Sequence, residues 1–216
     1  MKKIVFLTLA VIVFCSCSKK KENYTLDGVV SNPSYSEGSL ISQQIANNQI
    51  VSSDTILVES GKFSFTGVVD SICLKSVYSP NNEGVIPFVY IVEKGAITIE
   101  ISDGLVKVGG TPLNDKLQEF NNIFMGNNKT GRDLVAEFDK KQEAGTATPE
   151  EEAELRETLS KLAQGNDAAI INFAKENADN ILGEYCFMSF YFRVSKETRE
   201  QMDSFVTPKI KALLNL

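Results

Sequence analysis

The chain has 216 residues, with 22 lysine and arginine residues against 28 aspartate and glutamate residues, and it contains no histidine. The net negative charge argues against nucleic acid as a ligand, and the lack of histidine excludes the usual serine or cysteine triads and most zinc sites. A chain of this length can bury a sizeable core as one mixed domain or as two small ones.

The first residues resemble a lipoprotein signal. Two lysines precede an apolar run, residues 4–14, which is too short to span a bilayer as a helix and is typical of a signal-peptide core. The run ends in Phe14-Cys15-Ser16-Cys17, which resembles a lipobox, where a cysteine receives diacylglycerol and becomes the mature N-terminus. We therefore expect a signal peptide at residues 1–16, lipidation at Cys17 and a polar tether at residues 17–23. An ordinary secretory signal that is cut nearby is the alternative.

Residues 24–110 are predicted to form a β domain. Short runs of alternating apolar and polar residues predict strands at residues 24–30, 39–46, 50–58, 62–67, 71–78, 85–92, 96–101 and 105–108. Glu59-Ser60-Gly61 joins two of these runs, and its length and its glycine, which tolerates positive φ, predict a β-hairpin. About eight short strands with regular turns predict an antiparallel β-sandwich or an open barrel.

Residues 111–216 are predicted to be a helical region, so the expected fold class is α+β. Thr111 can cap the first helix, and Pro112 fits its first turn, where no amide hydrogen is needed. Gly126-Asn127-Asn128 predicts a break, which would leave separate helices at residues 112–125 and 132–143.

Strong start signals introduce the later helices. Thr148-Pro149-Glu150-Glu151 predicts a capping box, and Gly165-Asn166 either interrupts the helix that follows or lies within it. Ser195 is the expected cap of a last helix, which Pro208 should kink or divide.

The segment Ile181–Phe192 is the most apolar stretch after the signal. Its apolar and aromatic side chains surround nearly the whole predicted helix, so the helix should be buried. An aromatic ligand pocket and plain core packing both explain this composition, and apolar residues at helical spacing favour packing.

Few residues offer catalytic chemistry. Cys73 and Cys186 could form one disulfide, or each could be a small buried residue. Alternation in the strand at residues 71–78 places Cys73 and Lys75 on its less buried face. The acidic run Glu150-Glu151-Glu152 is better explained as a solvated helix start than as catalytic carboxylates, and a carboxylate-dependent hydrolase is the low-ranking alternative. No EF-hand or phosphate loop is present, so no metal and no cofactor are expected.

The β domain resembles a known family. The segments that carry the resemblance are Ser53-Asp54-Thr55, Gly61–Gly67, Glu93–Ile99 and Gly109–Asp115, in this order and spacing. Together they resemble the DUF4369 domains of Bacteroidetes lipoproteins. The resemblance implies a β domain that usually precedes a thioredoxin-like domain, with linking helices that often end in a segment like Ile171–Asn180. This segment is present here, but no Cys-x-x-Cys follows it.

The resemblance also bears on modification and location. Asp54-Thr55-Ile56 and Asp70-Ser71-Ile72 resemble the O-glycosylation pattern of Bacteroidetes, so Thr55 and Ser71 are candidate sites, although ordinary strand residues explain both equally well. In this phylum an acidic run after the lipidated cysteine resembles a surface-export signal. The run here is basic, so we expect an anchor in the outer membrane that faces the periplasm.

These observations lead to a functional expectation. We expect a cell-envelope lipoprotein that is a non-catalytic binding or interaction module, with a membrane contact through its lipid, a protein partner and no nucleic acid. Residues 31–38 and 79–84 are candidate binding loops. The alternative is an accessory to a thiol–disulfide oxidoreductase system that acts through a separate thioredoxin-like partner.

Overall fold

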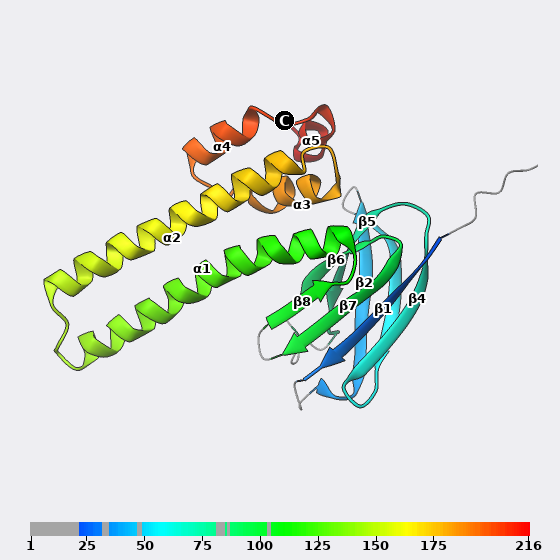
Figure 1. The fold of residues 1–216 in the computed structure, drawn as a ribbon, viewed down its shortest axis with the longest axis horizontal. Helices are drawn as coiled ribbons and strands as arrows, with labels where there is room; N and C mark the ends of the chain where they lie inside the picture. Colours follow the sequence, from blue (N-terminus) through cyan, green and yellow to red (C-terminus); the bar gives the residue numbers. More distant parts are fainter. Residues whose placement is uncertain (1–21, 32–34, 47–48, 81–84, 86, 103–104) are drawn as a thin grey trace, which may run out of the picture.

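The computed structural model describes residues 22–31, 35–46, 49–80, 85, 87–102 and 105–216. In these residues two four-stranded sheets precede five helices (Figure 1). The strands are β1 (Glu22–Val30), β2 (Gly38–Ala46), β3 (Gln49–Val58), β4 (Lys62–Val69), β5 (Cys73–Tyr78), β6 (Phe88–Val92), β7 (Gly95–Ser102) and β8 (Leu105–Gly109). The helices are α1 (Pro112–Glu143), α2 (Pro149–Glu176), α3 (Ile181–Phe190), α4 (Lys196–Asp203) and α5 (Pro208–Leu214). The predicted α+β fold with strands first is confirmed, and the sheets form a sandwich rather than a closed barrel.

The strand orders are β4-β1-β7-β8 in one sheet and β3-β2-β5-β6 in the other. β1 runs parallel to β7, with Leu26 opposite Ile97, and the other described strand pairs are antiparallel. The prediction of an antiparallel sandwich is therefore correct except at this central pair. Parallel strands need a long crossover, and here the chain passes through the whole second sheet before β7 returns beside β1.

The turn between β3 and β4 forms as predicted, but the two strands do not continue as a hairpin. Ser60 and Gly61 both have positive φ, 50° and 69°. Glu59 and Lys62 exchange backbone hydrogen bonds of 2.8 and 3.0 Å. Beyond this bridge, β3 pairs with β2 and β4 pairs with β1, in different sheets. The predicted hairpin is therefore wrong, because the turn residues fix only the reversal of the chain, whereas side-chain packing between the sheets decides which strand β4 joins.

Apolar side chains from both sheets fill the space between them. The buried members include Leu26, Val30, Leu40, Ile56, Val58, Val77, Ile97, Ile99, Ile101 and Val108. Across β1 and β4, two aromatic rings lie over two glycines. A methyl group at Gly28 would lie 2.1 Å from the ring of Phe63, and one at Gly67 would lie 2.4 Å from the ring of Tyr24. These pairs face each other in the strand register, so they help to fix it.

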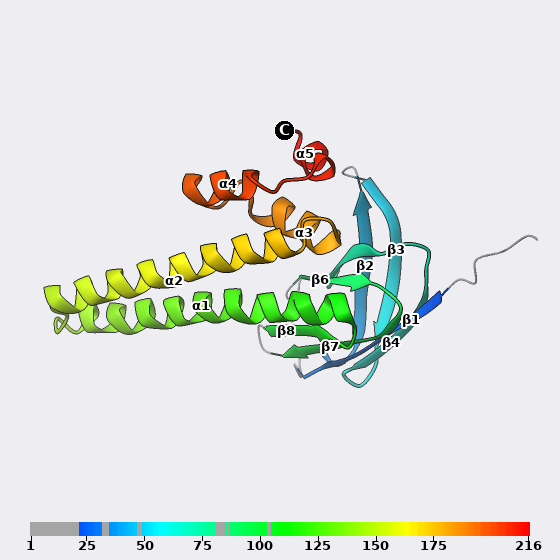
Figure 2. The same cartoon turned by 45° about the horizontal axis from the view of Figure 1, so that its top comes forward.

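A second core lies between the helices and the outer face of the β3-β2-β5-β6 sheet. It contains buried residues of all five helices together with Ile91 of β6, and Leu74 and Val89 pack against it. Figures 1 and 2 show α3, α4 and α5 gathered beside the C-terminal half of α2, while α1 and α2 extend away from the sheets as a pair.

One predicted helix break is wrong, and the structure decides two predictions that left alternatives open. α1 runs without a break through Gly126-Asn127-Asn128 for 32 residues. α2 runs through Gly165-Asn166, so these residues lie within the helix, and its predicted capping box at Thr148 and Glu151 is confirmed. The segment predicted as a last helix is divided into α4 and α5, as one of the two alternatives for Pro208 predicted. Pro208 begins α5, and Thr207 caps this helix by accepting a hydrogen bond from the Ile210 amide.

The first turns of α1 cover an edge strand of each sheet. The Asn114 side chain hydrogen-bonds to the backbone of Ile91 in β6, and Gln118 Oε1 accepts a 2.7 Å hydrogen bond from the Val108 amide in β8. An edge strand presents unpaired backbone groups, and these two side chains satisfy several of them. They also fix the direction in which α1 leaves the β domain.

Thr111 occupies the N-cap position of α1, but its side chain does not cap the helix. Glu93, at the end of β6, supplies the acceptor instead. Its Oε1 accepts from the amides of Leu113 at 2.7 Å and Asn114 at 3.2 Å. A carboxylate at a helix N-terminus also stabilises the helix dipole. The cap is therefore a tertiary contact, which local sequence does not reveal.

Candidate interaction site

The α1–α2 pair forms an arm that projects from the rest of the molecule (Figures 1 and 2). We use the name arm for residues 121–169, the part of the pair that lies beyond the buried residues Phe120 and Ile170. No residue of the arm itself is buried. The arm is therefore a two-helix structure whose contact surface is covered on one side only.

The two helices of the arm meet along a regular seam. Half-buried residues recur at spacings of three and four, as in a coiled coil. On α1 they are Phe124, Asn127, Gly131, Leu134, Phe138 and Lys141, and on α2 they include Leu155, Thr158, Leu162, Asn166 and Ala169.

A polar contact in the seam explains why α1 does not break. Asn166 of α2 donates from Nδ2 to Asn128 Oδ1 at 2.9 Å, and its Oδ1 accepts from Asn127 Nδ2 at 3.0 Å. Asparagine and glycine are weak helix formers, but these interhelical hydrogen bonds satisfy the amides inside the helix pair. The spacing of three and four continues through the expected break and is the signal that could have revealed it.

One side of the seam is hollowed into a groove of about 410 Å³. Its lining includes three small residues, Gly131, Ala136 and Ala163, together with Val135 and Leu162. Small residues allow another backbone to approach closely, and the apolar side chains offer surface to bury. Acidic residues outnumber basic ones in the arm. The groove can therefore accept an apolar helix, preferably one with basic neighbours.

The aromatic helix α3 is mainly core. Leu182, Cys186 and Phe187 are fully buried, and Phe190 makes edge-to-face contacts with two rings of α1. The packing interpretation therefore describes most of this helix. Met188 is exposed, which departs from the expectation that the apolar side chains all around the helix are buried.

The predicted modification sites lie in different surroundings. Cys17 lies outside the described residues. Thr55 is exposed on β3. Ser71 is exposed too, but it lies in the bend before β5 rather than in a strand, because β5 begins at Cys73. Both hydroxyl-bearing residues are accessible to a modifying enzyme, and their modification stays a prediction.

The two described cysteines are free thiols rather than a disulfide. Cys186 is fully buried, and burial raises the pKa of its thiol to about 12. Cys73 faces the space between the sheets, where burial raises its pKa and the nearby Lys75 ammonium partly opposes the shift. The prediction that Cys73 and Lys75 occupy a less buried face is wrong, because helices cover the other face of β5 but both residues point into the sandwich.

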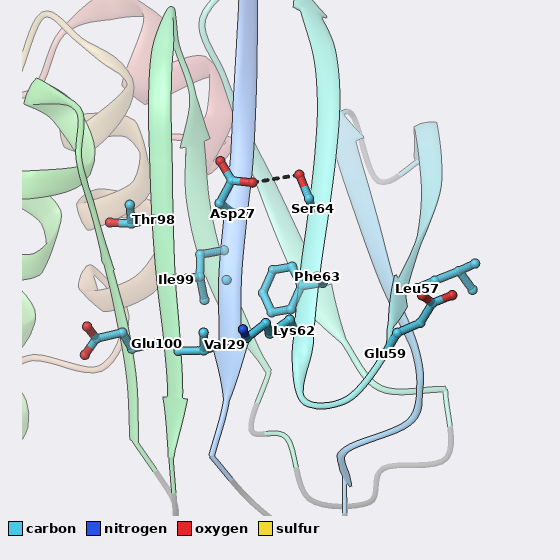
Figure 3. Close-up of a pocket in the computed structure, with 11 residues that line it drawn as sticks. Asp27, Val29, Leu57, Glu59, Lys62, Phe63, Ser64, Thr98, Ile99 and Glu100 are labelled. Atoms are coloured by element: carbon cyan, nitrogen blue, oxygen red, sulfur yellow. Dashed lines mark hydrogen bonds between the residues drawn. The ribbon is translucent and has the colours of Figure 1, made fainter.

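The outer face of the β4-β1-β7-β8 sheet carries a shallow depression (Figure 3). Ser64 donates a 2.6 Å hydrogen bond to Asp27 Oδ1 across β4 and β1. Figure 3 shows Glu100 on the other side of β7 from Asp27, so these carboxylates do not converge on a common point. This face gives no support to the carboxylate hydrolase.

The candidate binding loops are only partly described. Residues 32–34 and 81–84 lie outside the described residues. Among the loop residues that are described, Tyr35 and Ser79 are buried. Among the residues that the structure describes, no group of three or more cysteine, aspartate or glutamate side chains is placed to hold a metal ion. None of the described helices combines the length and hydropathy needed to cross a bilayer.

Comparison with known proteins identifies one family. Residues 24–117 match the family described as "Domain of unknown function (DUF4369)". Neither the curated proteins nor the solved structures gave a match. The matched segment covers both sheets and the first turns of α1, and it ends before the arm. The β-sandwich with the attached start of α1 is therefore a DUF4369 domain, and this chain carries it in front of a helical region.

Proposed function

We propose that this protein is a lipid-anchored, non-catalytic interaction module of the cell envelope whose arm binds a protein partner. The single observation that carries the proposal is that 49 consecutive residues of regular helix and turn, from 121 to 169, contain no buried side chain. A helix pair that leaves its contact surface half-buried gains little stability from it, because most helical stability in proteins comes from burying an apolar face. A partner helix in the groove would supply that burial.

The chemistry of the groove defines the partner. The lining residues Val135, Leu159 and Leu162 match an apolar helix face, and the charged residues Arg132 and Asp139 also line the groove. The excess of acidic residues in the arm favours a partner whose apolar face is flanked by lysine or arginine. We place the protein in the outer membrane with its domain facing the periplasm, on the basis of the lipobox at Cys17 and the basic tether.

The test uses the same substitution at two exposed alanines of α2. Ala163 lines the groove, whereas Ala153 lies near the tip of the arm outside the groove lining. Ala163→Glu places a charge in the groove, and Ala153→Glu is the matched control. The tagged full chain would carry a photo-crosslinking residue at Val135 in intact cells, and captured proteins would be identified by mass spectrometry.

We expect one specific protein to crosslink in the natural sequence and in A153E, and to be lost in A163E. Equal capture by both variants, or no capture above an uncrosslinked control, would refute the arm as the binding element. Cys17→Ser tests the location separately, because it should move the protein out of the membrane fraction.

A further inference from the structure

One end of the space between the sheets is polar. Most inward-facing residues of the sandwich are apolar, but Ser42, Gln44, Ser52, Asp54 and Lys75 take inward positions on β2, β3 and β5. Here the sheets part beyond the β3–β4 bridge and leave a cavity of about 240 Å³. This cavity is separate from the groove of the arm and is made by the DUF4369 domain alone.

A partly buried ion pair lies in the cavity wall. Lys75 is 8% exposed, and its Nζ donates a 2.6 Å hydrogen bond to Asp54 Oδ2. An ammonium group has three N–H donors, and this is the hydrogen bond that Lys75 makes among the described residues. Burying a charged pair is costly unless further hydrogen bonds satisfy both groups. The remaining donors and the second carboxylate oxygen are therefore available to a molecule in the cavity.

A second, independent group points to the same conclusion. The Oγ of Ser52, one position before Ser53 on β3, is buried and makes no hydrogen bond among the described residues. Ser52 lines the cavity with Gln44. Buried polar groups in proteins are nearly always hydrogen-bonded, and the exceptions call for a water molecule or a ligand.

The chemistry of the wall selects a class of ligand. The charges of Lys75 and Asp54 cancel in their ion pair, so this pair favours neither an anionic nor a cationic ligand. A mixture of ammonium, carboxylate, amide and hydroxyl groups suits a molecule whose groups both donate and accept. The rings of Tyr24 and Phe65, whose centroids lie 6.1 Å apart, add apolar surface to the same wall.

We propose that this cavity binds a small neutral polyhydroxylated ligand, such as a pyranose sugar. The volume lies below the range of about 300–1,000 Å³ that is typical of drug-sized ligands, which limits the ligand to about one sugar ring. Val68, Asp70 and Ser71 line the cavity and are exposed, so it opens to solvent on this side. A free monosaccharide and the terminal residue of a glycan both fit this opening.

The test is saturation-transfer NMR on the full chain in detergent micelles. The probes are glucose, galactose, mannose and N-acetylglucosamine, each as the free sugar and as its methyl glycoside. Transfer to both forms would identify a site that accepts a glycan end, and transfer to the free sugar alone would identify a monosaccharide site. No transfer from any probe at tens of millimolar would overturn the proposal and assign the cavity to water.

Two valine substitutions on one strand locate the binding. Ser52→Val fills part of the cavity and removes the unpaired hydroxyl, so the fold should be retained. Ser53→Val is the matched control, because the neighbouring side chain is exposed on the opposite face of β3. We expect S52V to weaken sugar binding by about tenfold or more and S53V to leave it unchanged. Equal binding by both variants would place the sugar elsewhere and overturn the proposal.

Cys73 gives a second measurement on the unaltered protein. It also lines the cavity, so bound sugar should slow its alkylation. A rate that does not change at saturating sugar would contradict binding at this place.

Discussion

The side-chain amide of Asn114 pairs with both backbone groups of Ile91. Its Oδ1 accepts from the Ile91 amide at 2.8 Å, and its Nδ2 donates to the Ile91 carbonyl at 2.8 Å. Asn114 is fully buried, and Ile91 lies on the edge strand β6. The Asn114 side chain therefore supplies the hydrogen bonds that a further strand would supply at this edge, and it joins the helical region to the β domain.

Asn114→Ala should destabilise the protein strongly. The change leaves the amide and the carbonyl of Ile91 buried without partners, and each such group costs about 1–3 kcal/mol. We expect the free energy of unfolding, measured by urea denaturation, to fall by roughly 2–5 kcal/mol. Lys116→Ala, on the exposed side of the same turn, should have little effect. A similar small change in the free energy of unfolding in both variants would show that the hydrogen bonds of Asn114 to Ile91 do not hold α1 in place.

Asn114→Asp separates shape from hydrogen bonding. Aspartate has the same shape, but it cannot donate to the Ile91 carbonyl, and it brings a second carboxylate near Glu93. We therefore expect N114D to be at least as destabilised as N114A at neutral pH and to recover partly in acid, where the new carboxyl group can take a proton and donate. Thermal unfolding of N114D and N114A at neutral pH and in acid measures this recovery of stability.

Gly28→Ala should force Phe63 out of its place. The added methyl group would lie 2.1 Å from the ring, and overpacking in a core costs about 1–3 kcal/mol. Combining the change with Phe63→Leu should cost less than the sum of the single changes, because leucine leaves room above residue 28. A double-mutant cycle measures the coupling. Additive free energies of unfolding would contradict the ring-over-glycine contact as the source of strain.

The thiols should be unreactive in the native protein. The thiolate is the nucleophile, and burial raises the pKa of Cys186 to about 12 and also raises that of Cys73. We expect iodoacetamide at pH 8 to label Cys73 slowly and Cys186 only after unfolding, as followed by peptide mass spectrometry. Fast native labelling of Cys186 would refute its burial. Slow labelling of both would weaken the alternative of a redox accessory, which needs an accessible thiolate.

The ion pair at the tip of the arm should make stability depend on pH. A 3.1 Å hydrogen bond from Lys141 Nζ, followed by one from the Thr148 amide, lowers the pKa of Glu151. Because the folded pKa lies below the unfolded one, the stabilisation is present above the ordinary glutamate pKa of about 4.3 and is lost as the pH falls through the lowered value.

Glu151→Gln tests this dependence, because glutamine keeps the capping geometry but loses the charge. We expect a small decrease in Tm at pH 7 that disappears at low pH, as measured by circular dichroism. Glu150→Gln controls for the general effect of charge at the helix N-terminus. A decrease in Tm of the same size at both pH values would contradict the ion pair as its cause.

Strand positions could be predicted closely because alternation is a local signal. The predicted strand at residues 50–58 is β3 with one further residue, and the capping box at Thr148 forms as predicted. The helix–helix contact of the arm was harder to predict from the sequence. Gly126-Asn127-Asn128 has the composition of a break, and only Asn166, which is distant in the sequence, supplies the hydrogen bonds that keep the helix intact.

By itself, the sequence determined the strands, the change from strands to helices, the α+β class and the family resemblance, because turn residues, caps and periodicity act over a few residues. Only the tertiary structure decided which strands pair, what caps α1 and which polar residues face inward. Glu59 and Lys62 bridge β3 and β4 although these strands join different sheets, and Lys75 is buried because Asp54 of another strand pairs with it. These outcomes depend on contacts between distant segments, whose free energies no local pattern contains.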